Sequence, residues 1–381
     1  MNEISSLKVA LVVDSMVAKG GSDRNIDSLL KIFPKADIYT AIFNEEEYGD
    51  LNNEVYTTFL QKSFLRKIFK THYNILTPWA FEMLDLRNYE LVVSVSAGSA
   101  KGVITTMDQL HICLLLTPPR TYWDKERSFR TSKLKFIINL LTPFFSNFYR
   151  LWDYSVAQRL DEIVVISKFI QKKVEHRYNR DSVVIHPGIL DFWFEEGNQN
   201  LGDLIPKNFK EEYFLVVSRL YDYKRIDWAI KACKKEGKKL IIVGDGPDIK
   251  YLKKLGGKSK DILFLGYISD EQLKAVYTNA TAFIFPGIED FGLVPVEAMA
   301  CGCPVLAYNY GGLKETVQDG KTGFFFSNVE ELSYLLRDFK KDFFKEKDLK
   351  SRAKEFSEEK FLKQFSSFTS KKYEEFRKKR I

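Results

Sequence analysis

Short apolar runs recur along the whole chain, and they constrain its fold more than any other feature. In the first half they occupy residues 7–13, 36–43, 89–96, 111–116 and 162–167, with helical or loop material between them. Apolar runs of strand length are typical of parallel strands that are buried on both faces of a sheet. The first half therefore predicts a doubly wound α/β domain.

The second half repeats this plan. Its apolar runs are residues 213–218, 239–246, 262–266, 282–286, 304–308 and 323–326. The segment between the halves, 192–212, is polar and lacks periodicity, which indicates a linker. A chain of 381 residues also exceeds the usual size of a single core. We therefore expect two Rossmann-like domains, 1–191 and 213–353, with a ligand cleft between the carboxyl ends of their sheets.

The last segment, 354–381, carries aromatic residues among charged ones, and it predicts C-terminal helices that pack back toward the first domain. The basic charge of the chain is concentrated near this end. Residues 337–381 contain sixteen Lys and Arg against nine Asp and Glu, which accounts for the net charge of +7. Such a surplus fits either a solvated helical face or attraction to an anionic membrane surface or an acidic substrate.

Composition argues against several classes of protein. No nucleic-acid recognition motif accompanies the basic charge, so we expect no nucleic-acid partner. The four histidines lack metal-ligand spacing, so we expect no metal site. The four cysteines fit reduced thiols, and we see no signal peptide or membrane-spanning run. We therefore expect a cytoplasmic protein.

Residues that could bind a nucleotide follow several of the second-half strands. Arg219, Lys224 and Arg225 lie within seven residues after the run 213–218. Arginine binds phosphate bidentately and lysine acts as a point charge, so these cations could clamp a diphosphate. The alternative is a surface loop with ordinary ion pairs.

Two further turns have the composition of ligand-binding loops. Gly244 and Gly246 would let the backbone approach a ligand closely, although they could equally form a simple tight turn. The pair Tyr267-Ile268 could stack on a base or fill the core.

The segment 286–300 carries two carboxylates, Glu289 in a loop and Glu297 early in a helix that we expect to begin near Pro295. Carboxylates accept hydrogen bonds from the hydroxyls of sugars and ribose. Backbone N–H groups at the start of this helix would favour a phosphate. Alternatively, Glu297 is an N-terminal charge that complements the helix dipole.

These motifs resemble the signature of glycosyltransferase family 4, whose members are retaining enzymes of the GT-B fold. The resemblance is carried by EDFGLVPVEAMACGCPVLAYNYGGLKETVQDGKTGFFF (289–326), SRLYDYKRID (218–227) and VGDGP (243–247). In the first half, DLRNYELVVSVSAGSAKGVIT (85–105), TPPRTYWD (117–124) and WDYSVAQRLDEIVVISKFIQKKV (152–174) resemble a subgroup that includes mannosyltransferases of bacterial surface-polysaccharide assembly.

The resemblance implies a role for each motif residue. Arg219 and Lys224 would neutralise the leaving diphosphate, Glu289 would hold the transferred sugar, and these three form the catalytic set. Glu297 would hold the ribose. The remaining donor contacts would come from Gly20, Gly21, Gly244, Gly246, Tyr267, Ile268, Phe291, Gly292 and Leu293.

The same resemblance suggests GDP-mannose as the donor, no required cofactor or metal, and a glycan or lipid-linked acceptor in surface polysaccharide or lipopolysaccharide synthesis. Relatives carry a His where this chain has Leu116 before Thr117-Pro118, so another group, Arg120 or Asp124, would serve the acceptor side. The alternatives are a UDP-sugar-dependent transferase, and a silent nucleotide-sugar-binding relative or partner subunit of another transferase.

Two segments mix basic and apolar residues, 61–70 and 133–154. Both could be amphipathic elements that rest on the inner face of a membrane, or core-facing helices with exposed basic residues. The first interpretation predicts a peripheral membrane protein.

Overall fold

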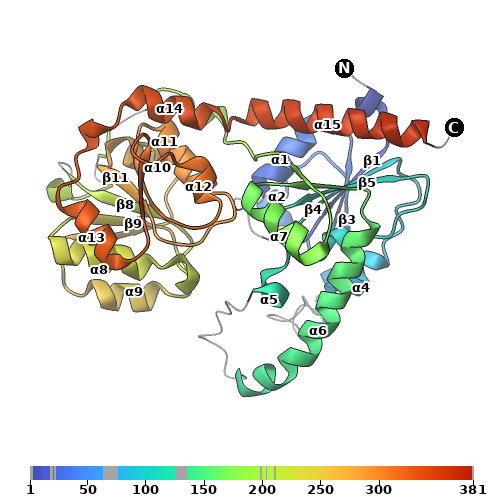
Figure 1. Cartoon of the computed structure of the whole chain (residues 1–381), viewed down its shortest axis with the longest axis horizontal. Coiled ribbons are helices and arrows are strands. Elements are labelled where there is room, and N and C mark those ends of the chain that lie inside the picture. Colours follow the sequence, from blue (N-terminus) through green and yellow to red (C-terminus); the bar gives the residue numbers. More distant parts are fainter. Residues whose placement is uncertain are drawn as a thin grey trace. The chain divides into compact units, whose positions relative to one another are not determined.

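The computed structural model divides the chain into two compact units (Figure 1), which are described separately below. Unit 1 contains residues 1–187 and 359–381, and unit 2 contains residues 188–358. The structure describes residues 3–17, 20, 23–62, 76–124, 135–197, 200–202, 204–209 and 212–379.

Unit 1 is built on a parallel sheet. Its described strands have the order β3-β2-β1-β4-β5-β6-β7. Every residue of β1, β4 and β5 is buried, which explains why these strands read as continuous apolar runs. The strands are β1 (Val9–Val13), β2 (Asp37–Thr40), β3 (Val55–Thr57), β4 (Leu91–Ser96), β5 (Leu110–Leu115), β6 (Glu162–Val165) and β7 (Val183–Val184).

Helices connect the strands of unit 1. They are α1 (Asp23–Ile32), α2 (Glu45–Tyr48), α4 (Thr77–Glu82), α5 (Arg120–Trp123), α6 (Lys135–Arg159) and α7 (Lys168–Tyr178), with short 3-10 turns η1 (Glu3–Ser6), η2 (Phe59–Gln61) and η4 (Ala100–Gly102). α7 begins where the Ser167 side chain accepts a hydrogen bond from the Ile170 N–H, and it ends at Asn179 in the left-handed conformation.

The C-terminal helix α15 (Glu358–Lys378) packs on unit 1 along almost its whole length. Lys372 forms an ion pair with Glu162 at 2.7 Å, and the Tyr373 hydroxyl lies 3.2 Å from the Glu90 carboxylate. Phe361 and Phe365 are buried on the same helix. The aromatic residues among charges therefore form the buried stripe of an amphipathic helix.

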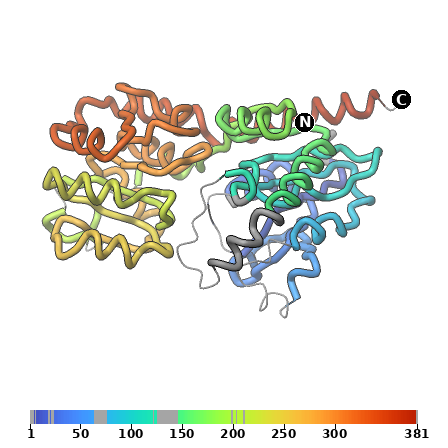
Figure 2. Tube along the Cα trace, turned by 60° about the horizontal axis from the view of Figure 1, so that its bottom comes forward, coloured from blue at the N-terminus to red at the C-terminus, as the bar shows by residue number. Residues whose placement is uncertain are grey.

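Unit 2 contains a second parallel sheet, whose described strands have the order β10-β9-β8-β11-β12-β13. Its strands are β8 (Phe214–Val217), β9 (Leu240–Val243), β10 (Ile262–Gly266), β11 (Ala282–Phe285), β12 (Val305–Tyr308) and β13 (Gly323–Phe326). α8 and α9 lie on one face of this sheet, and α11 and α14 on the other (Figures 1 and 2).

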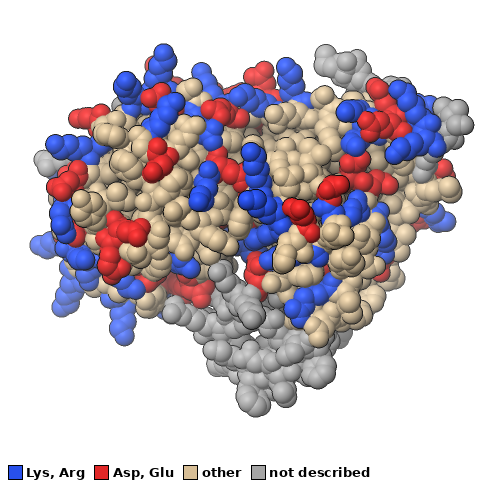
Figure 3. Space-filling model, in the orientation of Figure 1, with Lys and Arg blue, Asp and Glu red and all other residues tan. Residues whose placement is uncertain are grey.

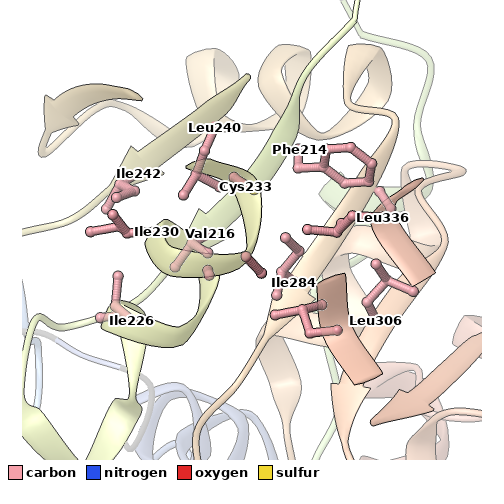
Figure 4. Close-up of a cluster of buried hydrophobic side chains, with 14 of the residues drawn as sticks. Phe214, Val216, Ile226, Ile230, Cys233, Leu240, Ile242, Ile284, Leu306 and Leu336 are labelled. Carbon is pink, nitrogen blue, oxygen red and sulfur yellow. The ribbon is translucent and has the colours of Figure 1, made fainter. Parts of the chain in front are cut away.

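The helices of unit 2 are α8 (Ile226–Glu236), α9 (Ile249–Gly256), α10 (Asp270–Asn279), α11 (Leu293–Ala300), α12 (Leu313–Thr316), α13 (Val329–Arg337) and α14 (Glu346–Lys354), with 3-10 turns η5 (Asp191–Phe194), η6 (Lys207–Phe209), η7 (Asp222–Lys224) and η8 (Lys341–Phe343). Figure 4 shows how Ile226 and Ile230 of α8 and Leu336 of α13 pack on strand residues such as Val216 and Leu306. Full burial of an aliphatic side chain contributes about 1.5–3 kcal/mol, so this cluster holds both helices firmly on the sheet.

The segment that we expected to link the domains packs into unit 2. Trp193 and Phe209 are buried, and the Lys274 ammonium donates a hydrogen bond to the Phe192 carbonyl. The Ile189 N–H donates to the Phe356 carbonyl at 2.9 Å, and the Glu358 N–H donates to the Ile189 carbonyl at 3.0 Å. The two points where the chain enters and leaves unit 2 therefore hydrogen-bond to each other.

Candidate functional site

The order of strands in unit 2 reverses between β8 and β11. From β8 the chain moves outward through β9 and β10, then returns to β11 and continues outward through β12 and β13. Ligands of such sheets bind outside the carboxyl ends of the strands at this switch point. The loops that carry Arg219, Gly244, Glu289 and Tyr310 all begin at these carboxyl ends.

The structure brings together two of the predicted catalytic residues from different loops. Lys224 ends η7, and its ammonium forms an ion pair with the Glu289 carboxylate in the loop after β11. The same ammonium lies 5.2 Å from the centre of the Phe285 ring. Arg219 is exposed after β8, and its guanidinium lies 5.9 Å from the Tyr221 ring. Lys224 therefore already has a carboxylate partner, whereas Arg219 projects toward solvent.

Glycines allow the loops after β8 and β9 to pack directly on each other. Gly244 has a φ of +119°, and a β-carbon there would lie less than 3.0 Å from the Ser218 carbonyl oxygen. A β-carbon on Gly246 would lie 2.6 Å from the carbonyl oxygen of Leu220. These two predicted donor-binding glycines therefore have a structural role, which is to seat one loop against the other.

Glycines also join the loops after β11 and β12 to each other. The Gly312 N–H donates a hydrogen bond to the Glu289 carbonyl at 2.9 Å. A β-carbon on Gly312 would lie less than 3.0 Å from the Asp290 carbonyl oxygen, and one on Gly287 would lie 2.9 Å from the Lys224 α-carbon. The backbone that carries Glu289 is thus held on both sides by backbone of neighbouring loops.

Helix α11 begins two residues earlier than we expected. Its first residue is Leu293, and Gly292 caps it with a φ of +101°. Pro295 is the third helical residue, where the missing N–H costs nothing because the first four N–H groups of a helix have no partner within it. Phe291 is buried against Phe356, with ring centres 5.4 Å apart.

Glu297 is the fifth residue of α11 and is only 2% exposed. The first turn of this helix contains no acidic residue, so Glu297 lies farther from the helix N-terminus than a start near Pro295 would place it. Glu297 is thus a buried side chain of α11 and not a surface charge.

Tyr267 and Ile268 follow β10, and their side chains differ in exposure: one is on the surface and the other is in the core. Tyr267 is 90% exposed, so the alternative that it fills the core is wrong, whereas Ile268 is buried. Gly266 precedes them with a φ of +68° and turns the chain outward. The Tyr267 ring is thus available to stack on a ligand.

Unit 1 has its own switch point, between β1 and β4. Gly20 is exposed in the loop after β1, and Gly21 lies outside the described residues. Sequence reasoning missed Asp14, which directly follows β1. Its carboxylate accepts hydrogen bonds from the Ala97 N–H at 2.6 Å and the Ala100 N–H at 2.7 Å. An Asp at the end of an apolar strand was the only available signal for this role.

The predicted acceptor-side residues, Arg120 and Asp124, belong to α5 and the residue after it. Asp124 forms ion pairs with Arg177 and, at 3.6 Å, with Lys173. Arg120 is the first residue of α5 and is half-buried. Asp124 is thus engaged by α7, whereas Arg120 follows Leu116 by four residues in the chain.

A buried polar network that sequence reasoning missed anchors α5. Lys101 and Asp153 form an ion pair at 2.6 Å, and both side chains are fully buried. The Asp153 carboxylate also accepts hydrogen bonds from the Trp123 indole and the Tyr178 hydroxyl, each at 2.6 Å. A buried ion pair tolerates its desolvation only with such additional hydrogen bonds.

His111 does not replace the missing histidine. It lies in β5, between β4 and β6, and is buried in the interior of the sheet. Its ring lies 2.8 Å from the Ser94 hydroxyl, and burial lowers its pKa to about 3. The ring is therefore neutral at physiological pH. Across the described part of the chain, no cluster of three or more His, Cys, Asp or Glu could hold a metal ion.

Comparison with known proteins agrees with this geometry. The family model "Glycosyl transferases group 1" matches residues 203–356. An uncharacterized glycosyltransferase of Methanocaldococcus jannaschii is 31% identical over 188 residues, which cover 45% of this chain and 48% of that protein. The GDP-mannose-dependent alpha-(1-6)-phosphatidylinositol monomannoside mannosyltransferase of Mycobacterium tuberculosis is 38% identical over 99 residues, which cover 23% of this chain and 26% of that protein. The matches thus span about half or less of these relatives.

Solved structures cover nearly the whole chain. Sucrose-phosphate synthase from Thermosynechococcus elongatus has a TM-score of 0.75 at 17% identity and covers 96% of this chain and 99% of that one. The Anabaena protein HepE in complex with UDP-glucose has a TM-score of 0.70 at 18% identity and covers 96% of this chain and 100% of that one. Residues 203–356 therefore match a group 1 glycosyltransferase domain, in agreement with the predicted family. The chain shares the fold of these solved structures, which confirms the predicted GT-B fold.

The packing of Gly312 gives a first prediction. Gly312→Ala should displace the Glu289 loop and lower the free energy of unfolding by about 1–3 kcal/mol, the usual cost of overpacking. Gly256→Ala is the matched control, because its β-carbon would meet only ordinary contacts at 3.5 Å or more. Urea denaturation of both variants measures the difference. Equal stability of Gly312→Ala and the wild type would contradict the close approach of the two loops.

Proposed function

We propose that this protein is a retaining hexosyltransferase that moves a sugar from a nucleoside-diphosphate donor to a glycan or lipid-linked acceptor. The observation that carries the proposal is the pairing of Lys224 with Glu289 at the carboxyl edge of a group 1 glycosyltransferase domain, with Arg219 at the end of the neighbouring strand. The two cations can bind the diphosphate of a nucleotide sugar, and the carboxylate can bind the hydroxyls of its sugar.

Each residue has a distinct role in this mechanism. Negative charge develops on the diphosphate as the glycosidic bond breaks, and Arg219 and Lys224 stabilise that charge. The N–H groups at the start of α11, near Gly292 and Leu293, add to the positive potential at the phosphate. Glu289 accepts hydrogen bonds from the hydroxyls of the transferred sugar, and Glu297 from those of the ribose.

The anomeric configuration is retained because the acceptor attacks on the side that the diphosphate leaves. Glu289 is paired with Lys224, which suits a hydroxyl-binding carboxylate better than a nucleophile or a general acid. The mechanism therefore differs from that of a retaining glycosidase, in which one carboxylate attacks the sugar and another protonates the leaving group. For the acceptor side, Arg120, the first residue of α5 in unit 1, is the proposed substitute for the histidine that relatives carry.

GDP-mannose is the donor that the relatives favour, because the mycobacterial relative is GDP-mannose-dependent. A UDP-sugar is the second candidate, since the HepE structure, which shares the fold, contains UDP-glucose. Tyr267 would stack on the base in either case, next to the glycine turn at 244–246. The acceptor would be a precursor of surface polysaccharide.

A silent nucleotide-sugar-binding relative is the alternative from another class. Leu116 supports it, because a leucine cannot make the polar contact of a histidine near the reacting sugar. Donor binding without transfer or hydrolysis would favour this alternative.

Donor binding gives the second prediction. GDP-mannose at one hundred times its Kd should stabilise the wild type by about 2.7 kcal/mol, and it should raise the thermal midpoint more than UDP- or ADP-sugars do. Glu297→Ala should weaken this shift, whereas Glu330→Ala, in the first turn of α13, should not. A thermal-shift panel measures all of these. No shift with any nucleotide sugar would contradict the proposed function.

We also propose that unit 1 docks on an anionic membrane surface, as a peripheral protein of the cytoplasmic face. Of the two amphipathic segments that suggest this, residues 63–70 and 133–134 lie outside the described residues. α6 exposes Phe148 and Leu151, α4 exposes Trp79, and Met83 is exposed directly after α4. The Trp79 and Phe148 rings stack with centres 6.0 Å apart, so the two helices share one apolar surface.

This surface has the composition of an interfacial element, since tryptophan and other large apolar side chains enter the headgroup region. Within the described residues, no helix is both long and apolar enough to cross a membrane. On the face shown in Figure 3, acidic and basic side chains are interspersed over the described surface. The apolar contact therefore has to supply much of the binding.

The third prediction tests this surface. Wild-type protein should cosediment with anionic liposomes and less with neutral ones, and Trp79→Ser with Leu151→Ser should abolish most of the binding. Met107→Ser is the control, because Met107 is equally apolar and exposed in a loop before β5. Absence of wild-type binding to anionic liposomes would refute membrane docking.

A further inference from the structure

Arg225 has a backbone conformation that an arginine rarely adopts. Its φ is +52°, and Asn179 is the only other non-glycine residue with a positive φ in the described ranges. Asn179 ends α7, where asparagine is common. Arg225 lies instead between η7 and α8, next to Lys224. A residue stays in a strained conformation only when its surroundings hold it there.

Two aromatic rings hold the Arg225 side chain. The centre of its guanidinium lies 4.9 Å from the Trp228 ring and 4.7 Å from the Tyr308 ring. These rings are perpendicular, with centres 5.7 Å apart, so the guanidinium packs in the corner between them. In the described part of the chain no carboxylate pairs with Arg225. Cation–π contact with the rings, not an ion pair, therefore fixes this side chain.

The contact with Tyr308 completes a closed set of links among three loops. Lys224 pairs with Glu289, so η7 is joined to the loop after β11. Gly312 bonds to the Glu289 backbone, so that loop is joined to the loop after β12. Tyr308 is the last residue of β12, so Arg225 joins η7 to the start of the loop after β12. Each loop thus contacts the other two.

We propose that Arg225 is a positioning residue for the transfer reaction. Its guanidinium ties η7 to the end of β12 and so holds the Lys224 ammonium where it neutralises the leaving diphosphate. This inference rests on the proposed function for the role of Lys224. The strained backbone follows from the same requirement, because the chain must reverse within one residue to present Lys224 to Glu289 and Arg225 to Tyr308.

Substitutions at position 225 separate positioning from folding. Arg225→Gly relieves the strain, because glycine adopts a positive φ freely, so the thermal midpoint should not fall. The kcat for transfer from GDP-mannose, or from the nucleotide sugar that binds best, should nevertheless drop on the order of tenfold, because Lys224 is misplaced. Arg225→Lys keeps the charge but loses the planar contact, and it should show a similar loss. Tyr308→Phe keeps the ring and should retain wild-type kcat.

Two controls make the test specific. Asn179→Gly relieves the same kind of backbone strain in unit 1 and should leave kcat unchanged. In a Lys224→Met background, Arg225→Gly should cause no further loss of kcat, because the two residues act through one interaction. Additive losses in the double variant would overturn the positioning role.

Hydrogen exchange gives a readout that does not depend on activity. The Lys224 N–H donates to the Tyr221 carbonyl at 3.0 Å and the Arg225 N–H to the Asp222 carbonyl at 2.9 Å. Both amides should exchange faster in Arg225→Gly. Unchanged exchange together with wild-type kcat would overturn the inference. If the wild type turns over no nucleotide sugar, the proposed function fails. Faster amide exchange in Arg225→Gly would then still support the link between η7 and β12. Unchanged exchange in that variant would overturn the link.

Discussion

The direct contact of backbone with backbone at the carboxyl edge of the unit 2 sheet is the constraint on which the candidate site depends. Gly312 packs on the backbone of Asp290, and Gly287 packs on the backbone of Lys224. Side-chain ion pairs at a protein surface contribute little by themselves. Because backbone packing fixes the two loops, Lys224 and Glu289 pair without a large loss of side-chain entropy. A site that stabilises developing charge needs this kind of preorganisation.

In both units, neighbouring loops are joined at the switch point of the sheet, but by different groups. In unit 2, glycines let neighbouring loops touch at the switch point between β8 and β11. In unit 1, a carboxylate does the corresponding work between β1 and β4, since Asp14 accepts two N–H groups of the loop after β4. The buried pair of Lys101 and Asp153 then anchors α5 beside that edge. Parallel sheets leave these loops as the only polar surface at their carboxyl ends, so function concentrates there.

The sequence predicts those features that depend on local pattern. Buried parallel strands appear as apolar runs, and the spacing of Glu289 and Glu297 is typical of a family motif. The start of α11 was placed two residues late because proline suits several positions of the first turn. Asp14, Lys101 and Asp153 were missed because their partners lie 25 to 86 residues away in the chain, and no local pattern encodes such pairs.

The positive φ of Arg225 could not be predicted from the sequence either, because such a conformation is normally signalled by glycine.

The central claim is that Arg219 and Lys224 stabilise the leaving diphosphate. The rate of sugar transfer by the Arg219→Ala, Lys224→Ala double variant tests this claim most directly. Loss of such electrostatic contacts typically slows a reaction by about 10²–10³-fold each, so a drop of at least that size is predicted. Wild-type transfer rates in the double variant would contradict the account.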